Sequence, residues 1–230
     1  MNGLTHPGGK EITKKAFDLC RLPESSKVLD IGCNDGSTAA YLTSKYNLRV
    51  TGIDKSADAI LNAKEKYPEI EFIEGDGQSL NFPSLSFDCV LMECTLSLMQ
   101  HPVEAIHEAF CVLKEGGYLI MHDLYLQNPA LEDFELLEEI RKPRAEDGEN
   151  CGQERRFICT VNGVLIMNDI DAALDDLEFN IMLFEDRKPD LDSFAASKIF
   201  EGGNIEEYSI DKKGKTKISY FLLVARKVKK

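Results

Sequence analysis

Residues 27–38, Lys27-Val-Leu-Asp-Ile-Gly-Cys-Asn-Asp-Gly-Ser-Thr38, decide how this chain is interpreted. The apolar run from Val28 to Ile31 is typical of a buried strand, and Gly32 and Gly36 then predict a tight turn before a helix. A strand, a turn and a helix start in this order bring backbone amides close to a ligand at the helix N-terminus. Asp30 stands where a dinucleotide-binding loop requires glycine, so the stretch favours a nucleoside that carries no pyrophosphate.

Strands and helices are expected to alternate along the first half of the chain. Strands are predicted at 27–31, 48–53, 70–74, 87–92 and 117–122, and helices at 10–22, 37–46, 57–67 and 102–114. This alternation predicts right-handed crossover units and a mainly parallel sheet, in which ligands bind at the carboxyl ends of the strands.

The second half follows a different pattern. An acidic helix is expected from Pro129 to Ile140, followed by a charged loop over 141–156. The Asn-Gly pair within residues 157–166 predicts a hairpin turn, or else a stretch that leads directly into a helix at 168–177. A sixth strand is expected at 180–184, then a helix at about 190–200 and a seventh strand at 219–225.

Asp30, Gly32, Asn34 and Gly36 occupy the spacing of a D-x-G-x-G-x-G motif whose middle glycine is replaced by asparagine. At these residues, and over roughly residues 5–125, the chain resembles the class I S-adenosylmethionine-dependent methyltransferases. The resemblance implies a Rossmann-like α/β fold, with a seven-stranded, mostly parallel sheet, an antiparallel last strand and helices on both faces. Asparagine tolerates a left-handed backbone, so we expect the turn to survive the substitution.

The same resemblance implies S-adenosyl-L-methionine as the cofactor and S-adenosyl-L-homocysteine as its product. Asp54 ends an apolar strand 24 positions after Asp30 and is expected to accept both ribose hydroxyls, as an acid at a comparable spacing does in dinucleotide folds. Asp76 is expected to face the adenine amino group. The implied cofactor site comprises Asp30, Gly32, Cys33, Asn34, Gly36, Asp54, Lys55, Asp76, Gly77 and Glu93, with Cys33 and Asn34 acting mainly through backbone groups.

Methyl transfer from a sulfonium is a direct displacement, so alignment matters most, and a base is needed only where the acceptor must lose a proton. Glu93, Asp123 and Tyr125 are the candidate catalytic residues, and a backbone contact to the cofactor is the alternative for Glu93. Cys94 lacks the preceding proline of cytosine-carbon methyltransferases and is interpreted as a packed thiol. The four histidines are scattered along the chain, so no metal site is predicted.

The chain is expected to form a single domain over 1–230. Its N-terminal part, about 1–22, is predicted to act as a lid through His6, Gly8 and Gly9, with a flexible leader as the alternative. The insertion at about 129–166 is predicted to cap the acceptor pocket, with a packing element or a dimer contact as the alternative.

Composition limits the partners. A net charge of −13 argues against a nucleic-acid partner, although the residues from 211 onward are locally basic. The seven cysteines form no close cluster and are interpreted as reduced thiols of a cytoplasmic protein. No apolar run is long enough to cross a membrane, and a homodimer is left open.

The sequence therefore predicts a methyltransferase (EC 2.1.1.-) that acts on a small molecule, with O, N, S, C and As all open as the acceptor atom. A non-catalytic S-adenosylmethionine-binding sensor or partner subunit is the alternative, because of Asn34 and the lack of an evident base. A dinucleotide-dependent oxidoreductase is disfavoured, because the chain lacks a G-x-G-x-x-G loop.

Overall fold

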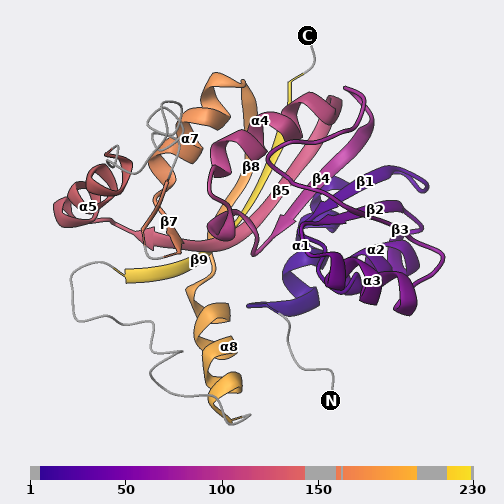
Figure 1. Ribbon diagram of the computed structural model, residues 1–230, viewed down its shortest axis with the longest axis horizontal. Coiled ribbons are helices and arrows are strands. Elements are labelled where there is room, and N and C mark those ends of the chain that lie inside the picture. The colour runs from indigo at the N-terminus through magenta and orange to yellow at the C-terminus, as the bar shows by residue number, and fades with distance from the viewer. Residues whose placement is uncertain (1–5, 143–158, 162, 201–216, 229–230) are drawn as a thin grey trace.

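The computed structural model describes residues 6–142, 159–161, 163–200 and 217–228. Its central sheet runs in the order β3-β2-β1-β4-β5, and these five strands are parallel (Figure 1). The strands are β1 (Lys27–Ile31), β2 (Arg49–Asp54), β3 (Glu71–Glu74), β4 (Phe87–Glu93) and β5 (Leu113–Gln127). The predicted parallel half of the sheet is therefore present, with its carboxyl ends along one edge.

The last two long strands complete the sheet beyond β5. β9 (Lys217–Lys227) pairs antiparallel with β5, from Tyr118 opposite Arg226 to Gln127 opposite Lys217. β8 (Phe179–Asp186) pairs antiparallel with β9 on its other side. The antiparallel last strand therefore lies between the fifth and sixth long strands, and the predicted fold class is confirmed.

Helices cover both faces of this sheet. One face packs against α1 (Gly9–Cys20), α2 (Ser37–Tyr46), α3 (Ala57–Lys66) and α8 (Lys188–Phe200). The other face packs against α4 (Pro102–Val112) and α7 (Met167–Asp176). The apolar positions that predicted α1, including Ile12, Ala16 and Phe17, are almost fully buried against the sheet, as its amphipathic spacing requires.

The junction between α4 and β5 differs from the prediction of a helix to residue 114 and a glycine turn. α4 ends at Val112 and β5 begins at Leu113, so the glycine pair lies inside the strand. There Gly116 adopts a φ of +77°, and the pairing with β4 is irregular. A Cβ on Gly117 would lie 2.9 Å from the Lys114 carbonyl oxygen, so the stretch forms a bulge that only small residues fit.

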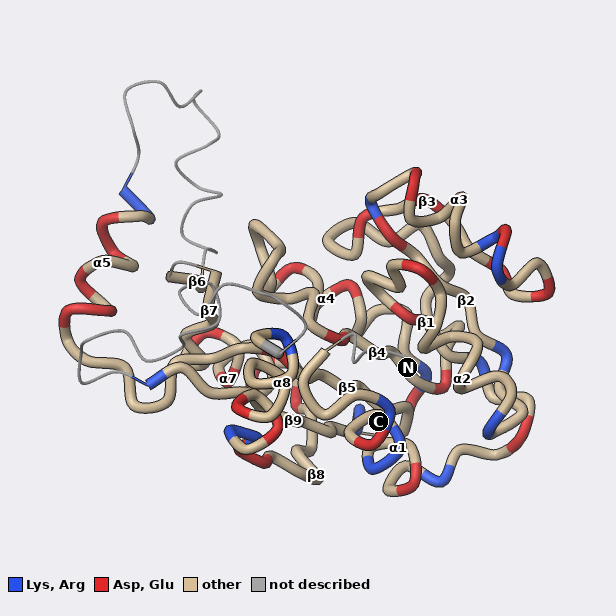
Figure 2. The backbone as a smooth tube through the Cα atoms, turned by 90° about the horizontal axis from the view of Figure 1, so that it is seen from below, with Lys and Arg blue, Asp and Glu red and all other residues tan. Residues whose placement is uncertain are grey.

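The inserted region contains α5 (Leu131–Arg141) and a short hairpin of β6 (Thr160–Val161) and β7 (Val164–Leu165). Gly163 has a φ of +74° at the hairpin turn, and α7 follows directly, so both alternatives drawn from the Asn-Gly pair hold. α5 stands away from the sheet and carries a run of acidic residues (Figure 2). The loop predicted over 141–156 lies, from residue 143 onward, outside the described residues.

Within the described ranges, no helix is long and apolar enough to cross a bilayer. Across the same residues, no three His, Cys, Asp or Glu side chains gather in a way that could hold a metal ion. The six described cysteines are free thiols, four of them buried.

Candidate functional site

A cavity of about 750 Å³ opens at the carboxyl ends of β1, β2 and β4. This is the edge at which parallel α/β sheets bind their ligands, and the volume falls in the usual range for small-molecule sites. Most residues that the sequence singled out line this cavity: His6, Asp30, Gly32, Cys33, Asn34, Asp54, Lys55, Asp76, Gly77 and Glu93. Gly8, Gly9, Gly36, Asp123 and Tyr125 are not among its lining residues.

The loop after β1 has the backbone that the motif predicts. Gly32 and Gly36 have φ of +78° and +75°, and Asn34 has φ of +46°, so the asparagine adopts the left-handed conformation of the glycine it replaces. A Cβ on Gly32 would lie 2.3 Å from the Thr95 hydroxyl oxygen, and one on Gly36 would lie 2.5 Å from the Phe72 ring. The loop therefore keeps its close approach despite Asn34.

Asp54 connects this loop to the start of α3. Its Oδ2 accepts a hydrogen bond from the Asn34 amide at 3.0 Å, and its Oδ1 accepts one from the Ser56 amide at 2.9 Å. Ser56 in turn caps α3, because its hydroxyl accepts from the Ala59 amide. Each Asp54 oxygen keeps further acceptor capacity beyond these bonds, and Asp54 lines the cavity.

Asp30 is the unusual acid of the cavity. It is 2% exposed, and its Oδ2 has no hydrogen-bond partner among the described residues. Burial raises the pKa of Asp30 well above its ordinary value, and the nearby Glu93 and Asp54 carboxylates raise it further. A buried carboxylate oxygen without a partner is costly, so this atom is a site where a cation or an N–H group would be stabilised.

The loop after β3 brings Asp76 and Gly77 to the same cavity. Asp76 pairs with Lys55 at 2.9 Å and accepts a hydrogen bond from the Gln78 amide. A Cβ on Gly77 would lie 2.5 Å from a methyl group of Ile31, so this loop packs closely on the end of β1. Three separate βα loops thus converge on the cavity.

Glu93, at the end of β4, is a junction of several elements. Its carboxylate accepts hydrogen bonds from Thr13 of α1 at 2.6 Å, Thr38 of α2 at 2.8 Å and His122 of β5 at 2.7 Å. Burial opposes its charge, but His122, His6 and Thr13 together lower the pKa of Glu93 to about 2. The carboxylate is therefore ionised at neutral pH and a weak base, so this catalytic candidate is poorly suited to accept a proton.

His122 continues the polar chain from β4 across β5 towards β9, on the same face of the sheet. Because an ionised carboxylate only accepts hydrogen bonds, His122 Nε2 donates to Glu93, and in the neutral ring Nδ1 accepts from the Tyr220 hydroxyl at 2.6 Å. The Tyr220 hydroxyl also lies 2.9 Å from the Cys94 sulfur. Burial raises the pKa of the Cys94 thiol, so this thiol is a weak nucleophile, in agreement with its interpretation as a packed residue.

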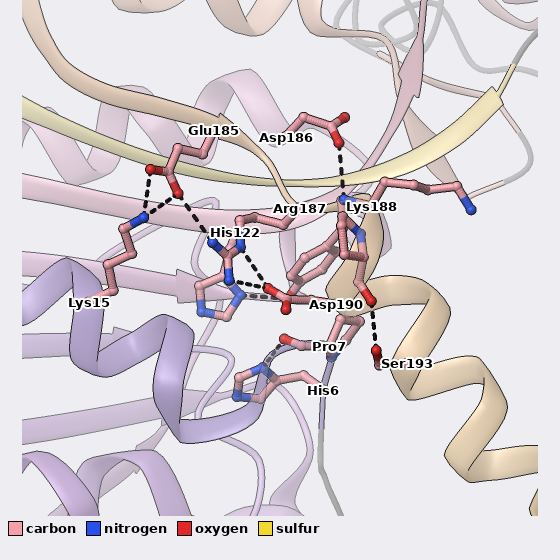
Figure 3. A network of polar contacts seen from close by, with 12 residues as sticks. His6, Pro7, Lys15, His122, Glu185, Asp186, Arg187, Lys188, Asp190 and Ser193 are labelled. Atoms are coloured by element: carbon pink, nitrogen blue, oxygen red, sulfur yellow. Dashed lines mark hydrogen bonds and ion pairs between the residues drawn. The ribbon is translucent and has the colours of Figure 1, made fainter.

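His6 brings the N-terminal segment to the same place. Its ring faces the His122 ring (Figure 3), with 5.0 Å between their centroids. Its Nε2 is 3.7 Å from the Glu93 carboxylate. Gly8 follows with a φ of +76°, and a Cβ there would contact Ile12 and Asp190. Gly8 is therefore held closely between α1 and α8.

A family model described as a methyltransferase domain matches residues 29–121, which span the loop, the cavity and β1 to β5. Over these residues the chain is similar to the class I S-adenosylmethionine-dependent methyltransferases, as the motif predicted.

Named relatives match a longer part of the chain than this family model does. The chain is 31% identical over 144 residues to phosphoethanolamine N-methyltransferase 1 of Arabidopsis thaliana. This alignment covers 61% of this chain and 29% of that protein. The Zea mays protein of the same name is 29% identical over 201 residues, covering 84% of this chain and 40% of that protein. The chain thus spans less than half the length of these relatives.

A solved structure extends the likeness to the whole fold. The complex of phosphoethanolamine N-methyltransferase 2 from Haemonchus contortus with S-adenosyl-L-methionine has a TM-score of 0.73 with this chain at 15% identity. The match covers 99% of this chain and 55% of that one. At this identity the similarity shows the fold.

Two of the predicted catalytic residues lie away from the cavity. The Asp123 carboxylate is buried and accepts from the Ser97 hydroxyl at 2.6 Å, and so holds the short 3-10 helix η1 (Leu96–Leu98). The Tyr125 hydroxyl donates to Asp186 at 2.6 Å, and its ring packs against Phe221 in the core. Because β5 continues to Gln127, both residues lie within a paired strand and outside the lining of the cavity.

The sequence analysis missed three polar partners of Glu93. Thr13 and Thr38 are hydroxyl residues near the ends of predicted helices, and His122 was considered only as a metal ligand. Thr13 lies on the apolar face of α1 beside Ile12 and Ala16, and it is 1% exposed. A hydroxyl on the buried face of an amphipathic helix requires a hydrogen-bond partner, and this was the available signal.

Proposed function

We propose that the chain is an S-adenosylmethionine-dependent methyltransferase that transfers a methyl group to a small-molecule acceptor. The observation that carries the proposal is the unpartnered, buried Oδ2 of Asp30, which belongs to the same cavity as Asp54. A ligand that brings positive charge and N–H groups fits this atom, and S-adenosylmethionine has both a sulfonium and an ammonium.

Three residues of the cavity have a proposed role in binding the donor. Asp54 accepts the ribose hydroxyls through the lone pairs that its two backbone partners leave, and Asp76 accepts from the adenine amino group. Gly32 allows the loop to approach the ligand closely. When bound, the donor supplies an electrophilic methyl group on sulfur. The chain then has to orient the acceptor in line with the methyl carbon and exclude water.

We also propose one domain with two covering segments. The placement of His6 against Glu93 supports a lid formed by the N-terminal part, about 1–22. The α5 helix and the β6–β7 hairpin support a cap formed by the insertion, because β7 pairs with β5 at Tyr125, beyond the active edge. A reducing compartment such as the cytoplasm suits the free thiols of the described residues.

Ligand-dependent melting tests the proposal. At 100 times its dissociation constant, S-adenosylmethionine or S-adenosylhomocysteine should stabilise the protein by about 2.7 kcal/mol, a rise of roughly 5–10 °C in melting temperature. NAD should have no effect.

Asp54→Ala should weaken donor binding by about 1–3 kcal/mol, whereas Asp58→Ala, an exposed acid on α3 outside the cavity, should leave it unchanged. Stabilisation by NAD alone, or by none of the three compounds, would contradict the proposal.

A further inference from the structure

The protonation of His6 follows from its neighbours. His6 Nδ1 lies 3.0 Å from the Pro7 carbonyl oxygen. A carbonyl oxygen only accepts, so Nδ1 carries a hydrogen, and in the neutral ring Nε2 has the free lone pair. His6 lines the cavity, and its other nitrogen is already used. Nε2 is therefore the atom that remains for a ligand.

The surroundings of His6 suit a group that takes up a proton. Burial lowers the pKa of His6, the ionised Glu93 carboxylate opposes this shift, and His122 adds to it. The ring is thus neutral near pH 7. Once Nε2 is protonated, the imidazolium has Glu93 3.7 Å away as a counter-charge. From α8, Asp190 packs on neighbouring Gly8, but it is already paired with Arg187.

The charge of the cavity indicates what kind of acceptor it takes. Its described lining holds five carboxylates, those of Asp30, Asp35, Asp54, Asp76 and Glu93, against the two lysines Lys55 and Lys66. Each lysine is paired with one of these acids, Lys55 with Asp76 and Lys66 with Asp35. A cavity with this excess of negative charge attracts cations and repels phosphate groups.

We propose that the acceptor is an amine without a phosphate group, bound as its ammonium, and that His6 Nε2 is the base that deprotonates it. This inference rests on the proposed function. The ammonium N–H bond breaks and its proton moves to Nε2. The nitrogen lone pair then bonds to the methyl carbon while the carbon–sulfur bond breaks, and its electron pair stays on sulfur. The products are the N-methylated ammonium and a neutral thioether, and His6 releases its proton to water.

His6→Gln tests the base, and His107→Gln is the matched control, because His107 is exposed on α4 and outside the cavity. The readout is S-adenosylhomocysteine formed with primary, secondary and tertiary amines, each assayed with and without a phosphate group. In His6→Gln we expect kcat/KM to fall by about 10²-fold or more while the Kd for S-adenosylmethionine stays the same. His107→Gln should behave as wild type.

The pH profile separates a base from a structural residue. As pH increases, wild-type kcat/KM should rise while His6 loses its proton, with the midpoint of this rise below pH about 6.5, and then reach a plateau. It should fall again near the amine pKa of about 10, where the ammonium disappears. His6→Gln should lose the first rise and instead gain activity up to the amine pKa, because only the neutral amine then reacts.

Three results would overturn the inference: an unchanged pH profile in His6→Gln, a weaker Kd for S-adenosylmethionine with unaltered turnover, or faster methylation of the phosphorylated amines. Donor binding without turnover of any amine would also overturn it and leave the proposed function standing. Failure to bind the donor at all would instead refute the proposed function.

Discussion

Asp30→Asn should make the ligand-free protein more stable and the donor complex weaker. The substitution keeps the shape of the side chain but removes a charge that is 2% exposed, with one oxygen unpartnered among the described residues. An unsatisfied buried polar group costs about 1–3 kcal/mol, and more if it is charged. A gain of about 2 kcal/mol corresponds to a rise of roughly 4–8 °C in melting temperature for a chain of this size.

The gain should depend on pH with a defined sign. Burial raises the pKa of Asp30 in the folded state, so unfolding releases a proton above the unfolded pKa of about 3.9. The contribution of Asp30 to the free energy of unfolding of the wild type is therefore fully present below pH about 4. It is lost as pH rises towards the pKa of Asp30 in the folded state. The difference between Asp30→Asn and wild type should be small at pH 4 and largest at neutral pH.

Melting curves between pH 4 and 8, with and without S-adenosylhomocysteine, would measure both effects. Asp35→Asn is the control on the same loop: its carboxylate is paired with Lys66 and accepts from the Ser37 amide, so its removal should bring no gain. A ligand-free Asp30→Asn protein that melts below wild type, together with unchanged ligand stabilisation, would refute the reasoning.

Three further predictions concern stability. Glu93→Gln should cost about 3 kcal/mol at pH 7, because its pKa of about 2 lies below the unfolded value of about 4.3; urea unfolding should show the cost shrinking as pH falls towards 2. Gly32→Ala should melt well below Gly163→Ala, since both have positive φ but only the first places a Cβ against Thr95; equal melting temperatures would rule out the steric argument. Lys227→Met should lose about 1–3 kcal/mol, because its ammonium donates to two main-chain carbonyls at the end of α4; unchanged thermal unfolding would contradict this.

Local patterns were sufficient to predict the parallel half of the fold. Short apolar runs followed by glycine or a carboxylate mark β1, β2 and β4, and their boundaries in the structure differ from the predicted ones by at most one residue. Helix α2 was predicted with its observed bounds. The α4–β5 junction was not, because a bulge depends on the neighbouring strand: Gly117 is limited by main-chain atoms of both β5 and β4.

Strand geometry explains why Asp123 and Tyr125 lie outside the cavity. We expected the fifth strand to end at residue 122 and therefore placed Asp123 and Tyr125 on a loop above the site. Pairing with β9 extends β5 to Gln127, and alternation along the strand then puts Tyr125 on the opposite face from His122. That pairing joins segments about 100 residues apart, so no local pattern in the sequence contains it.

The two buried acids of the cavity differ in a way that bears on function. Glu93 has its charge satisfied by Thr13, Thr38 and His122 before any ligand arrives, and its pKa is low. Asp30 has its charge unsatisfied, and its pKa is high. Glu93 therefore stabilises the fold of the site, whereas Asp30 holds a cost that a cationic or N–H-bearing ligand removes. A site that keeps one buried acid in this state gains ligand affinity at the expense of the stability of the free protein.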